Sequence, residues 1–358
     1  MALLGGKGGK GGKGGKGGKG GKGGKGDAQS EYTLDHAESP SSEFLSTALI
    51  STRDGLVGYW DATITRPDYS NVPRDPFAAY EAMEVDARSY VLDHNLHGLF
   101  TLDLQQDLCK LHESSNDILE LELIRPDFEA GNPKIGDFQL SCVKKAADLR
   151  SDRLPEIIIQ QTDFLSFFGA LATLEEDRTE HALGMLRAVL RMARHIAMQF
   201  KHVLDVARPA SLAFQVQPVI QTPGHGSWPS GHATEAFAVA TVFDALTHKG
   251  KAPERTESSP ALRLAARIAD NRTVAGVHFP TDSYAGALLG ISIGDVLVGY
   301  FSGGSIDKAK RRYDGKIERD DFSLARLLQK AEIQPNPKPV GKIELLNELW
   351  KAAVREMN

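Results

Sequence analysis

Cysteine is scarce in this sequence, which holds only Cys109 and Cys142 among its 358 residues. The two residues could pair or stay free, and neither has the spacing of a metal ligand. A free cysteine behaves as a small apolar residue and is usually buried. The sequence therefore predicts two buried thiols and excludes a disulfide-rich scaffold.

Long apolar runs are also missing. No stretch of about 18 or more uncharged apolar residues, the minimum for a transmembrane helix, occurs in the chain. Residues 1–4 are too short for the apolar core of a signal peptide. The sequence therefore predicts a soluble protein without membrane insertion, and it leaves the native compartment open.

Residues 5–26 form a Gly-Gly-Lys repeat without apolar side chains. Such a segment cannot bury enough surface to offset the entropy of ordering it. Residues 1–26 are therefore predicted to be a disordered tail, natural or added, with a polyanion-binding arm as a further alternative. Seven of the 42 lysines and arginines lie in the repeat, so the remainder carries 35 basic and 47 acidic residues, a formal charge of −12. This acidic body argues against nucleic acid as a partner, since phosphate backbones require a basic surface.

Helical periodicity dominates the chain after residue 42, whereas alternating strand patterns are scarce. The predicted helices span 75–96, 135–149, 155–173, 180–206, 230–247, 260–269, 280–300, 321–331 and 342–357. The Pro, Gly, His and Ser of residues 218–229 predict a loop. Nothing between these elements is typical of a domain linker. We therefore expect one all-α domain over residues 27–358, built as a helical bundle.

Lys201 and Arg208 form the first of three segments that suit a small oxyanion. They lie seven residues apart near the end of the helix predicted over 180–206. Two helical turns would bring both cations to one face, where they could bind the same anion. A solvated helix surface is the commoner explanation for such a pair, so this segment alone carries little weight.

The second segment, Pro229-Ser230-Gly231-His232, stands at a predicted helix start. Free backbone N–H groups and the positive end of the helix dipole favour an anion there. Gly231 lets the backbone come close, Ser230 can donate its hydroxyl, and His232 can exchange protons near neutral pH. An ordinary Ser-capped helix explains the same residues.

The third segment runs from Arg272 to Asp282. The planar guanidinium of Arg272 matches the geometry of an oxyanion. His278 follows six residues later, and Asp282, four further on, can accept one of its ring N–H groups. That bond would leave the other ring nitrogen free as a nucleophile or a ligand. A surface salt-bridge cluster is the alternative interpretation.

Together the three segments resemble the signature shared by bacterial class A acid phosphatases, type 2 phosphatidic acid phosphatases and vanadium-dependent haloperoxidases. The matching patterns are Lys-x6-Arg-Pro, Pro-Ser-Gly-His and Arg-x5-His-x3-Asp, within about residues 180–300. The resemblance implies a helical bundle of the acid phosphatase and vanadium haloperoxidase type, with its oxyanion site in this region. One position departs from the pattern, because Asn271 stands where the family usually has Ser. Asn271 can still donate a hydrogen bond.

The resemblance also implies a role for each residue of the site. His278 is expected to be the axial group, which either attacks phosphorus or coordinates vanadium, and Asp282 is expected to orient it. His232 is expected to act as the general acid–base. The groups expected to neutralise the equatorial oxygens are the side chains of Lys201, Arg208, Ser230 and Arg272 and the N–H of Gly231.

The same signature fits two reactions, because vanadate resembles the five-coordinate state of phosphoryl transfer and phosphate would occupy the same site. We expect a vanadium-dependent haloperoxidase that oxidises a halide, with bromide as the expected halide, by hydrogen peroxide and acts on a small organic substrate. The long helical region before the motifs favours this reaction, as does His225, which resembles a histidine of the bromide-using members. A polar loop residue is the alternative interpretation of His225. The alternatives are a soluble acid phosphatase that hydrolyses phosphate monoesters through a phosphohistidine, and a non-catalytic phosphate-binding scaffold. Residues 27–180 have no predicted role, and an entrance lid and a homo-oligomer contact both stay open.

Overall fold

The computed structural model describes residues 43–57, 74–114 and 118–358. The segment 1–26, predicted to be a disordered tail, lies outside the described residues. By its internal contacts the chain divides into two units, residues 1–88 and 89–358. The single domain expected over residues 27–358 therefore stays a prediction.

The first unit contains α4 (Glu43–Val57), α5 (Pro76–Glu81) and the start of α6 (Val85–His97). α5 begins after Asp75, whose side chain accepts two backbone N–H groups of the first turn. The sequence predicts one helix over 75–96, but the structure has two helices with a break between them. Arg88 stabilises this break, because its side chain donates to the carbonyl oxygens of Glu81 and Met83.

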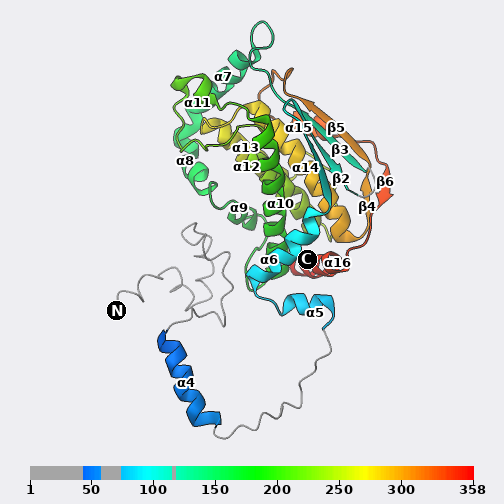
Figure 1. Cartoon of the computed structure of the whole chain (residues 1–358). Coiled ribbons are helices and arrows are strands. Elements are labelled where there is room, and N and C mark those ends of the chain that lie inside the picture. Colours follow the sequence, from blue (N-terminus) through cyan, green and yellow to red (C-terminus); the bar gives the residue numbers. More distant parts are fainter. Residues whose placement is uncertain (1–42, 58–73, 115–117) are drawn as a thin grey trace. The chain divides into compact units, whose positions relative to one another are not determined.

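The second unit is mostly helical and also contains a small mixed sheet (Figure 1). Its longer helices are α7 (Ile135–Ala146), α8 (Arg150–Ile159), α10 (Glu180–Leu204), α12 (Gly231–Thr247), α13 (Pro260–Val274), α14 (Pro280–Ser302), α15 (Leu324–Ala331) and α16 (Glu344–Met357). Its shorter helices are α9 (Leu165–Gly169), α11 (Pro209–Leu212), and the 3-10 turns η6 (Ala147–Leu149) and η7 (Phe214–Val216). Its strands are β1 (Phe100–Leu104), β2 (Leu108–Glu113), β3 (Leu119–Ile124), β4 (Ser305–Asp307), β5 (Ala309–Asp314) and β6 (Pro337–Pro339).

Most predicted helices of this unit are present, but several of their ends differ. The segment 155–173 forms two helices, α8 and α9, and Pro155 lies inside α8 rather than at its start. The helix predicted over 260–269 extends to Val274, so Arg272 lies in its last turn. α12 begins directly after Ser230, as predicted.

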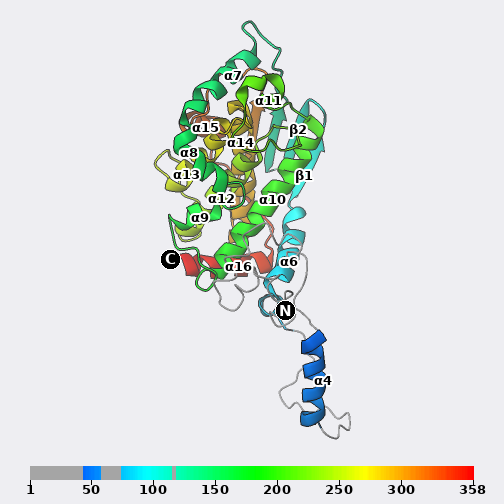
Figure 2. The ribbon, with the colours of Figure 1, turned by 90° about the vertical axis from the view of Figure 1, so that its left-hand side faces the viewer.

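The all-α prediction was wrong in one respect, because the second unit holds a four-stranded sheet in the order β1-β2-β3-β5. β1, β2 and β3 are antiparallel neighbours, and β3 pairs with β5 in parallel. β3 packs against α14, and Figure 2 shows β1 and β2 beside α10. Leu119, Leu121 and Leu123 of β3 are buried in alternation with glutamates. Leu and Glu are also strong helix formers, which is why this short strand pattern was overlooked.

The contact between α12 and α14 forms the core of the second unit (Figure 1). Two glycines of α14 allow the close approach of the helices. A Cβ atom added at Gly286 would lie 2.4 Å from the carbonyl oxygen of Ser230, and one added at Gly290 would lie 2.3 Å from that of Thr234. Since Ser230 belongs to the second motif, the same approach fixes the backbone of the predicted site.

Gly290→Ala is therefore expected to destabilise the protein by about 1–3 kcal/mol, because the new methyl group meets backbone that cannot rotate away. Urea unfolding of the two proteins measures this difference. Gly184→Ala in α10 is the matched control, since nothing lies within 4 Å of its added Cβ. It should stabilise the helix by about 0.5–1 kcal/mol. Equal effects of the two substitutions would contradict the packing argument.

One helix of the described residues, α14, is long and apolar enough to cross a membrane by its length and composition. This helix does not form an uninterrupted run of uncharged residues, because Asp282 and Asp295 lie within it. In the structure, 89% of its most apolar window is buried by the rest of the protein. Since a buried core helix passes the same test, this finding alone does not show a membrane span.

Candidate functional site

Lys201 is buried in the last turn of α10, with 1% of its surface exposed. Its Nζ donates to the carbonyl oxygens of Gly226 at 2.9 Å and Ser227 at 2.8 Å. A Cβ atom at Gly226 would lie 3.1 Å from the carbonyl oxygen of Lys201, so a larger residue there would crowd the end of α10. The loop before the second motif thus holds the ammonium group in place.

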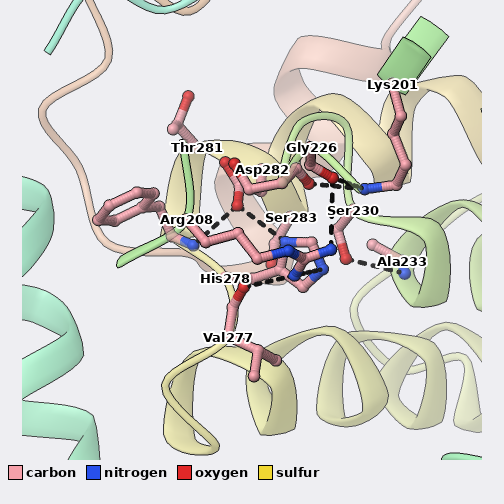
Figure 3. A network of polar contacts seen from close by, with 12 residues as sticks. Lys201, Arg208, Gly226, Ser230, Ala233, Val277, His278, Thr281, Asp282 and Ser283 are labelled. Carbon is pink, nitrogen blue, oxygen red and sulfur yellow. Dashed lines mark hydrogen bonds and ion pairs between the residues drawn. The ribbon is translucent and has the colours of Figure 1, made fainter. Parts of the chain in front are cut away.

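Arg208 reaches the same site by a route that the sequence did not predict. α10 ends at Leu204, and Asp205 takes a left-handed conformation with φ of 38°. Arg208 therefore lies beyond the helix, and the predicted two-turn register with Lys201 was wrong. Its guanidinium nevertheless lies in the site, where Nη1 donates to the carbonyl oxygen of Val277 at 2.8 Å. Figure 3 shows these side chains approaching one another from separate segments.

Ser230 and Gly231 form the start of α12, and both lie in the site. The hydroxyl oxygen of Ser230 accepts the N–H of Ala233 at 3.4 Å, which leaves the hydroxyl hydrogen free to be donated (Figure 3). The Ser230 N–H donates to the carbonyl oxygen of Asp282 at 2.9 Å. This bond joins the second motif to the third. A Cβ atom at Gly231 would lie 3.8 Å from the Lys201 side chain, so the helix start lies next to that cation.

His278 is buried and held by one bond on each ring nitrogen. Nδ1 lies 2.8 Å from Oδ2 of Asp282, and Nε2 lies 3.4 Å from Nη1 of Arg208 (Figure 3). An arginine can only donate, so Nε2 must be the acceptor and Nδ1 must carry the hydrogen. The pKa of His278 is held well below its usual value, first by burial and then by Arg208 and Lys201. The ring is therefore neutral, with a lone pair on Nε2.

Asp282 fixes this tautomer. Its Oδ2 also accepts the backbone N–H of Phe279 at 3.0 Å, at the start of α14. The carboxyl group is fully buried, and burial raises its pKa, while Lys201 and Arg208 act in the opposite direction. Asp282 therefore orients His278 through the ring nitrogen that faces away from the Arg208 side, as the sequence predicts.

Arg272 is 1% exposed and uses only part of its hydrogen-bonding capacity. Its Nη2 donates to the carbonyl oxygen of Ile157 at 3.2 Å and to Oε1 of Gln160 at 3.0 Å. Its Nε and Nη1 are buried and have no partner within the part of the chain that the structure describes. A buried donor without an acceptor costs about 1–3 kcal/mol, and more when it is charged. The Nε–H and Nη1–H groups of this guanidinium are therefore available to an acceptor oxygen.

His232 is half-buried and lies in the first turn of α12. Its Nε2 is 3.0 Å from the carbonyl oxygen of Gln160, which can only accept, so Nε2 carries a hydrogen. Burial lowers the pKa of His232 to about 3, and Arg272 adds to this effect. The ring is neutral in the anion-free site, which leaves Nδ1 as an acceptor.

His225 is exposed in the loop before the second motif. Its Nδ1 lies 3.2 Å from Nη2 of Arg208 and 3.2 Å from the carbonyl oxygen of Gly226. Because Arg208 can only donate, Nδ1 acts as an acceptor in the first contact and cannot also donate in the second. Burial lowers the pKa of His225. The histidine therefore supports Arg208, whereas its predicted role towards bromide or vanadate stays a prediction.

The electrostatics of the site favour a bound anion. Burial lowers the pKa of Lys201, Arg208 and Arg272 alike. A buried cation is costly unless a negative group pairs with it. The structure thus brings His232, His278 and Asp282 together with the three cations, although they come from separate segments of the chain.

α8 also contributes to this site, which the sequence did not predict. The carbonyl oxygens of Ile157 and Gln160 and the side chain of Gln160 contact Arg272 or His232. Asn271 stands where the family usually has Ser, and its side-chain hydrogen bonds go to residues other than Arg272 and His232. Its Nδ2 donates instead to Glu156 and Gln160, each at 3.0 Å. The one sequence signal for this contribution is Asn271, which departs from the family motif.

The sequence profile of the PAP2 superfamily matches residues 182–303, which include every motif residue from Lys201 to Asp282. Among similar proteins, decaprenylphosphoryl-5-phosphoribose phosphatase of Mycobacterium tuberculosis (strain CDC 1551 / Oshkosh) is 30% identical over 148 residues, or 41% of this chain and 75% of the relative. The protein of the same name from Mycolicibacterium smegmatis (strain ATCC 700084 / mc(2)155) is 34% identical over 122 residues, or 34% of this chain and 60% of the relative.

These matches agree with the three motifs and with their convergence on one buried site. The M. tuberculosis relative is covered over most of its length, so the similarity is not confined to a short motif. The resemblance noted in the sequence is confirmed, and the chain belongs to the PAP2 superfamily.

Proposed function

We propose that this protein is a phosphatase that hydrolyses phosphate monoesters through a phosphohistidine at His278. The observation that carries the proposal is the buried guanidinium of Arg272, whose Nε and Nη1 have no partner among the described residues. An oxygen of a phosphoryl group can accept from either of these N–H groups. Lys201 and Arg208 add two further buried cations, and such preorganised charge is the main source of catalysis in phosphoryl transfer.

The relatives support this reaction over the haloperoxidase that the sequence analysis favoured. Both of the similar proteins described above are named as phosphatases. Vanadate stays a predicted ligand, because the donors of Arg272 fit any tetrahedral oxyanion. If vanadate were bound, it would supply the activation of hydrogen peroxide. The role of His225 in bromide oxidation has no support from these relatives.

In the proposed first step, Nε2 of His278 attacks phosphorus with its lone pair, and the bond from phosphorus to the ester oxygen breaks. Asp282 accepts the Nδ1 hydrogen bond and so stabilises the positive charge that develops on the ring. The leaving alkoxide takes a proton from His232 and departs as an alcohol.

In the second step, water attacks phosphorus and gives a proton back to His232. The bond from phosphorus to His278 then breaks, and inorganic phosphate leaves. His232 must be protonated before the first step, although its pKa is about 3 in the anion-free site. The negative charge of the bound phosphoryl group opposes the effect of Arg272 and raises this pKa. Substrate binding thus prepares its own general acid.

Hydrolysis of a nitrophenyl phosphate, measured with and without orthovanadate, tests the proposal. We expect saturable hydrolysis that orthovanadate inhibits competitively, because both anions need the Arg272 donors. Bromide oxidation by hydrogen peroxide is measured on the same chelator-treated protein. Peroxidase activity that appears and saturates with vanadate, without ester hydrolysis, would overturn the proposal in favour of the haloperoxidase. Binding of phosphate without either activity would favour the non-catalytic scaffold.

A further inference from the structure

Gln160 at the end of α8 joins two residues of the candidate site, although it lies outside the segment 182–303 that matches the family. Its backbone carbonyl oxygen accepts Nε2–H of His232 at 3.0 Å. Its side-chain Oε1 accepts Nη2–H of Arg272 at 3.0 Å. Gln160 is 1% exposed, so water competes poorly for either bond.

The orientation of the Gln160 amide follows from its partners. Arg272 can only donate, so the atom that faces it must be the oxygen. The contact with Asn271 supports the same orientation. Oδ1 of Asn271 accepts from Arg153 at 3.2 Å, so its Nδ2 is the atom that faces Gln160, where it donates to Oε1 at 3.0 Å. The Nε2 group of Gln160 is left buried, without a partner in residues 43–57, 74–114 and 118–358.

The bonds from α8 also decide which N–H groups of Arg272 remain available. Nη2 has two hydrogens, and both acceptors that it uses, Ile157 O and Gln160 Oε1, come from α8. Nη1 and Nε are therefore the groups left for an anion. Without the Gln160 oxygen the guanidinium would lose one of its two anchors, and its Nε–H and Nη1–H groups would no longer be held in place.

α8 is itself firmly attached to α13, which carries Arg272. Glu156 accepts two bonds from Arg267, at 2.9 and 2.7 Å, and one from Asn271 at 3.0 Å. The bond from Arg267 is the main reason that the pKa of Glu156 is lowered to about 2. Asn271 thus serves as a link between helices, and Gln160 is held in a fixed position relative to Arg272.

We propose that Gln160 is a further residue of the phosphate site, which positions Arg272 and His232 and presents its free amide to the bound anion. The inference rests on the proposed phosphate site. It explains together why Arg272 keeps two N–H groups unpaired, why the Gln160 amide is buried without a partner, and why Asn271 replaces the usual Ser.

Calorimetric titration of inorganic phosphate into the full-length protein tests this role. Gln160→Met keeps the side-chain length but removes the oxygen and the amide, so the dissociation constant should rise about tenfold. Gln161→Met is the matched control, because Gln161 is the exposed neighbour and donates to the carbonyl oxygen of Ile158. Its phosphate affinity should equal that of the wild type.

Gln160→Glu supplies a readout that a purely structural role would not change. A carboxylate can still accept from Arg272, but its negative charge repels phosphate. Relative to the wild type at each pH, phosphate affinity should be weakest at high pH and should recover as the new carboxyl is protonated. If a thermal melt shows that Gln160→Met is not folded, the pH dependence of Gln160→Glu still tests the inference.

The inference is overturned if folded Gln160→Met binds phosphate as tightly as the wild type, or if the affinity of Gln160→Glu relative to the wild type does not change with pH. Failure of the proposed function looks different, since the wild type would then bind phosphate without hydrolysing an ester. The phosphate titrations still test Gln160 in that case.

Discussion

His278→Ala is expected to reduce phosphate-ester hydrolysis by at least about 10⁴-fold, because removing the nucleophile of an acyl- or phosphoryl-transfer site leaves only the binding groups. The reason lies in the neutral ring, whose Nε2 has a lone pair and whose Nδ1–H is bonded to Asp282 at 2.8 Å. Nε2 of His278 lies next to Arg208, one of the three cations of the site. Steady-state hydrolysis of a nitrophenyl phosphate measures the loss.

The binding of inorganic phosphate separates this loss from unfolding. His278→Ala should still bind phosphate within a few-fold of the wild type, because Lys201, Arg208 and Arg272 remain. His202→Ala is the control, since this histidine is exposed on α10 next to Lys201 and should tolerate the change without loss of activity. Turnover by His278→Ala near the wild-type rate would rule out the phosphohistidine.

His232→Ala is expected to lower kcat by about 10²–10⁴-fold for an alkyl phosphate, the usual contribution of a general acid. A nitrophenyl phosphate should lose less, because its leaving group departs without a proton. Phosphate binding should change little, since the cations of the site remain. Equal losses with both esters, or loss of binding without loss of kcat, would show that His232 has another role.

The pH dependence of the same reaction tests the state of His232. Burial and Arg272 hold its pKa at about 3 in the anion-free site, and the bound phosphoryl group raises it. A general acid must be protonated, so kcat for an alkyl phosphate should fall as the pH rises through the raised pKa. kcat reports the substrate complex, whereas kcat/KM reports the free enzyme. The falling limb of kcat should be absent in His232→Ala.

Much of the site could be predicted from sequence, because the three motifs carry side chains whose chemistry is specific. Ser230 caps α12, and His278 bonds Asp282, as their spacing indicates. The convergence of Lys201 and Arg208 was also predicted, but for the wrong reason. The helix ends before Arg208, and only a left-handed residue at Asp205 returns the chain to the site.

The contribution of α8 could not be predicted, because it depends on backbone carbonyls and on one glutamine. A carbonyl such as that of Ile157 has no sequence signature, and a lone Gln160 has no motif around it. Asn271 could be recognised in the sequence as a departure from the family pattern, but the sequence did not indicate which residues its side chain would contact. The sheet was missed for a related reason, since β3 is short and its Leu-Glu alternation uses residues that also favour helices.

Rapid-quench trapping with a phosphate ester labelled on phosphorus is the most direct test of phosphoryl transfer through His278. The quenched protein is digested under alkaline conditions, in which a phosphohistidine survives, and the labelled peptide is identified by mass spectrometry. We predict that the label appears on the peptide that contains His278 before phosphate is released, and that His278→Ala carries none. Ester hydrolysis without any labelled protein, or a label on another residue, would contradict the account.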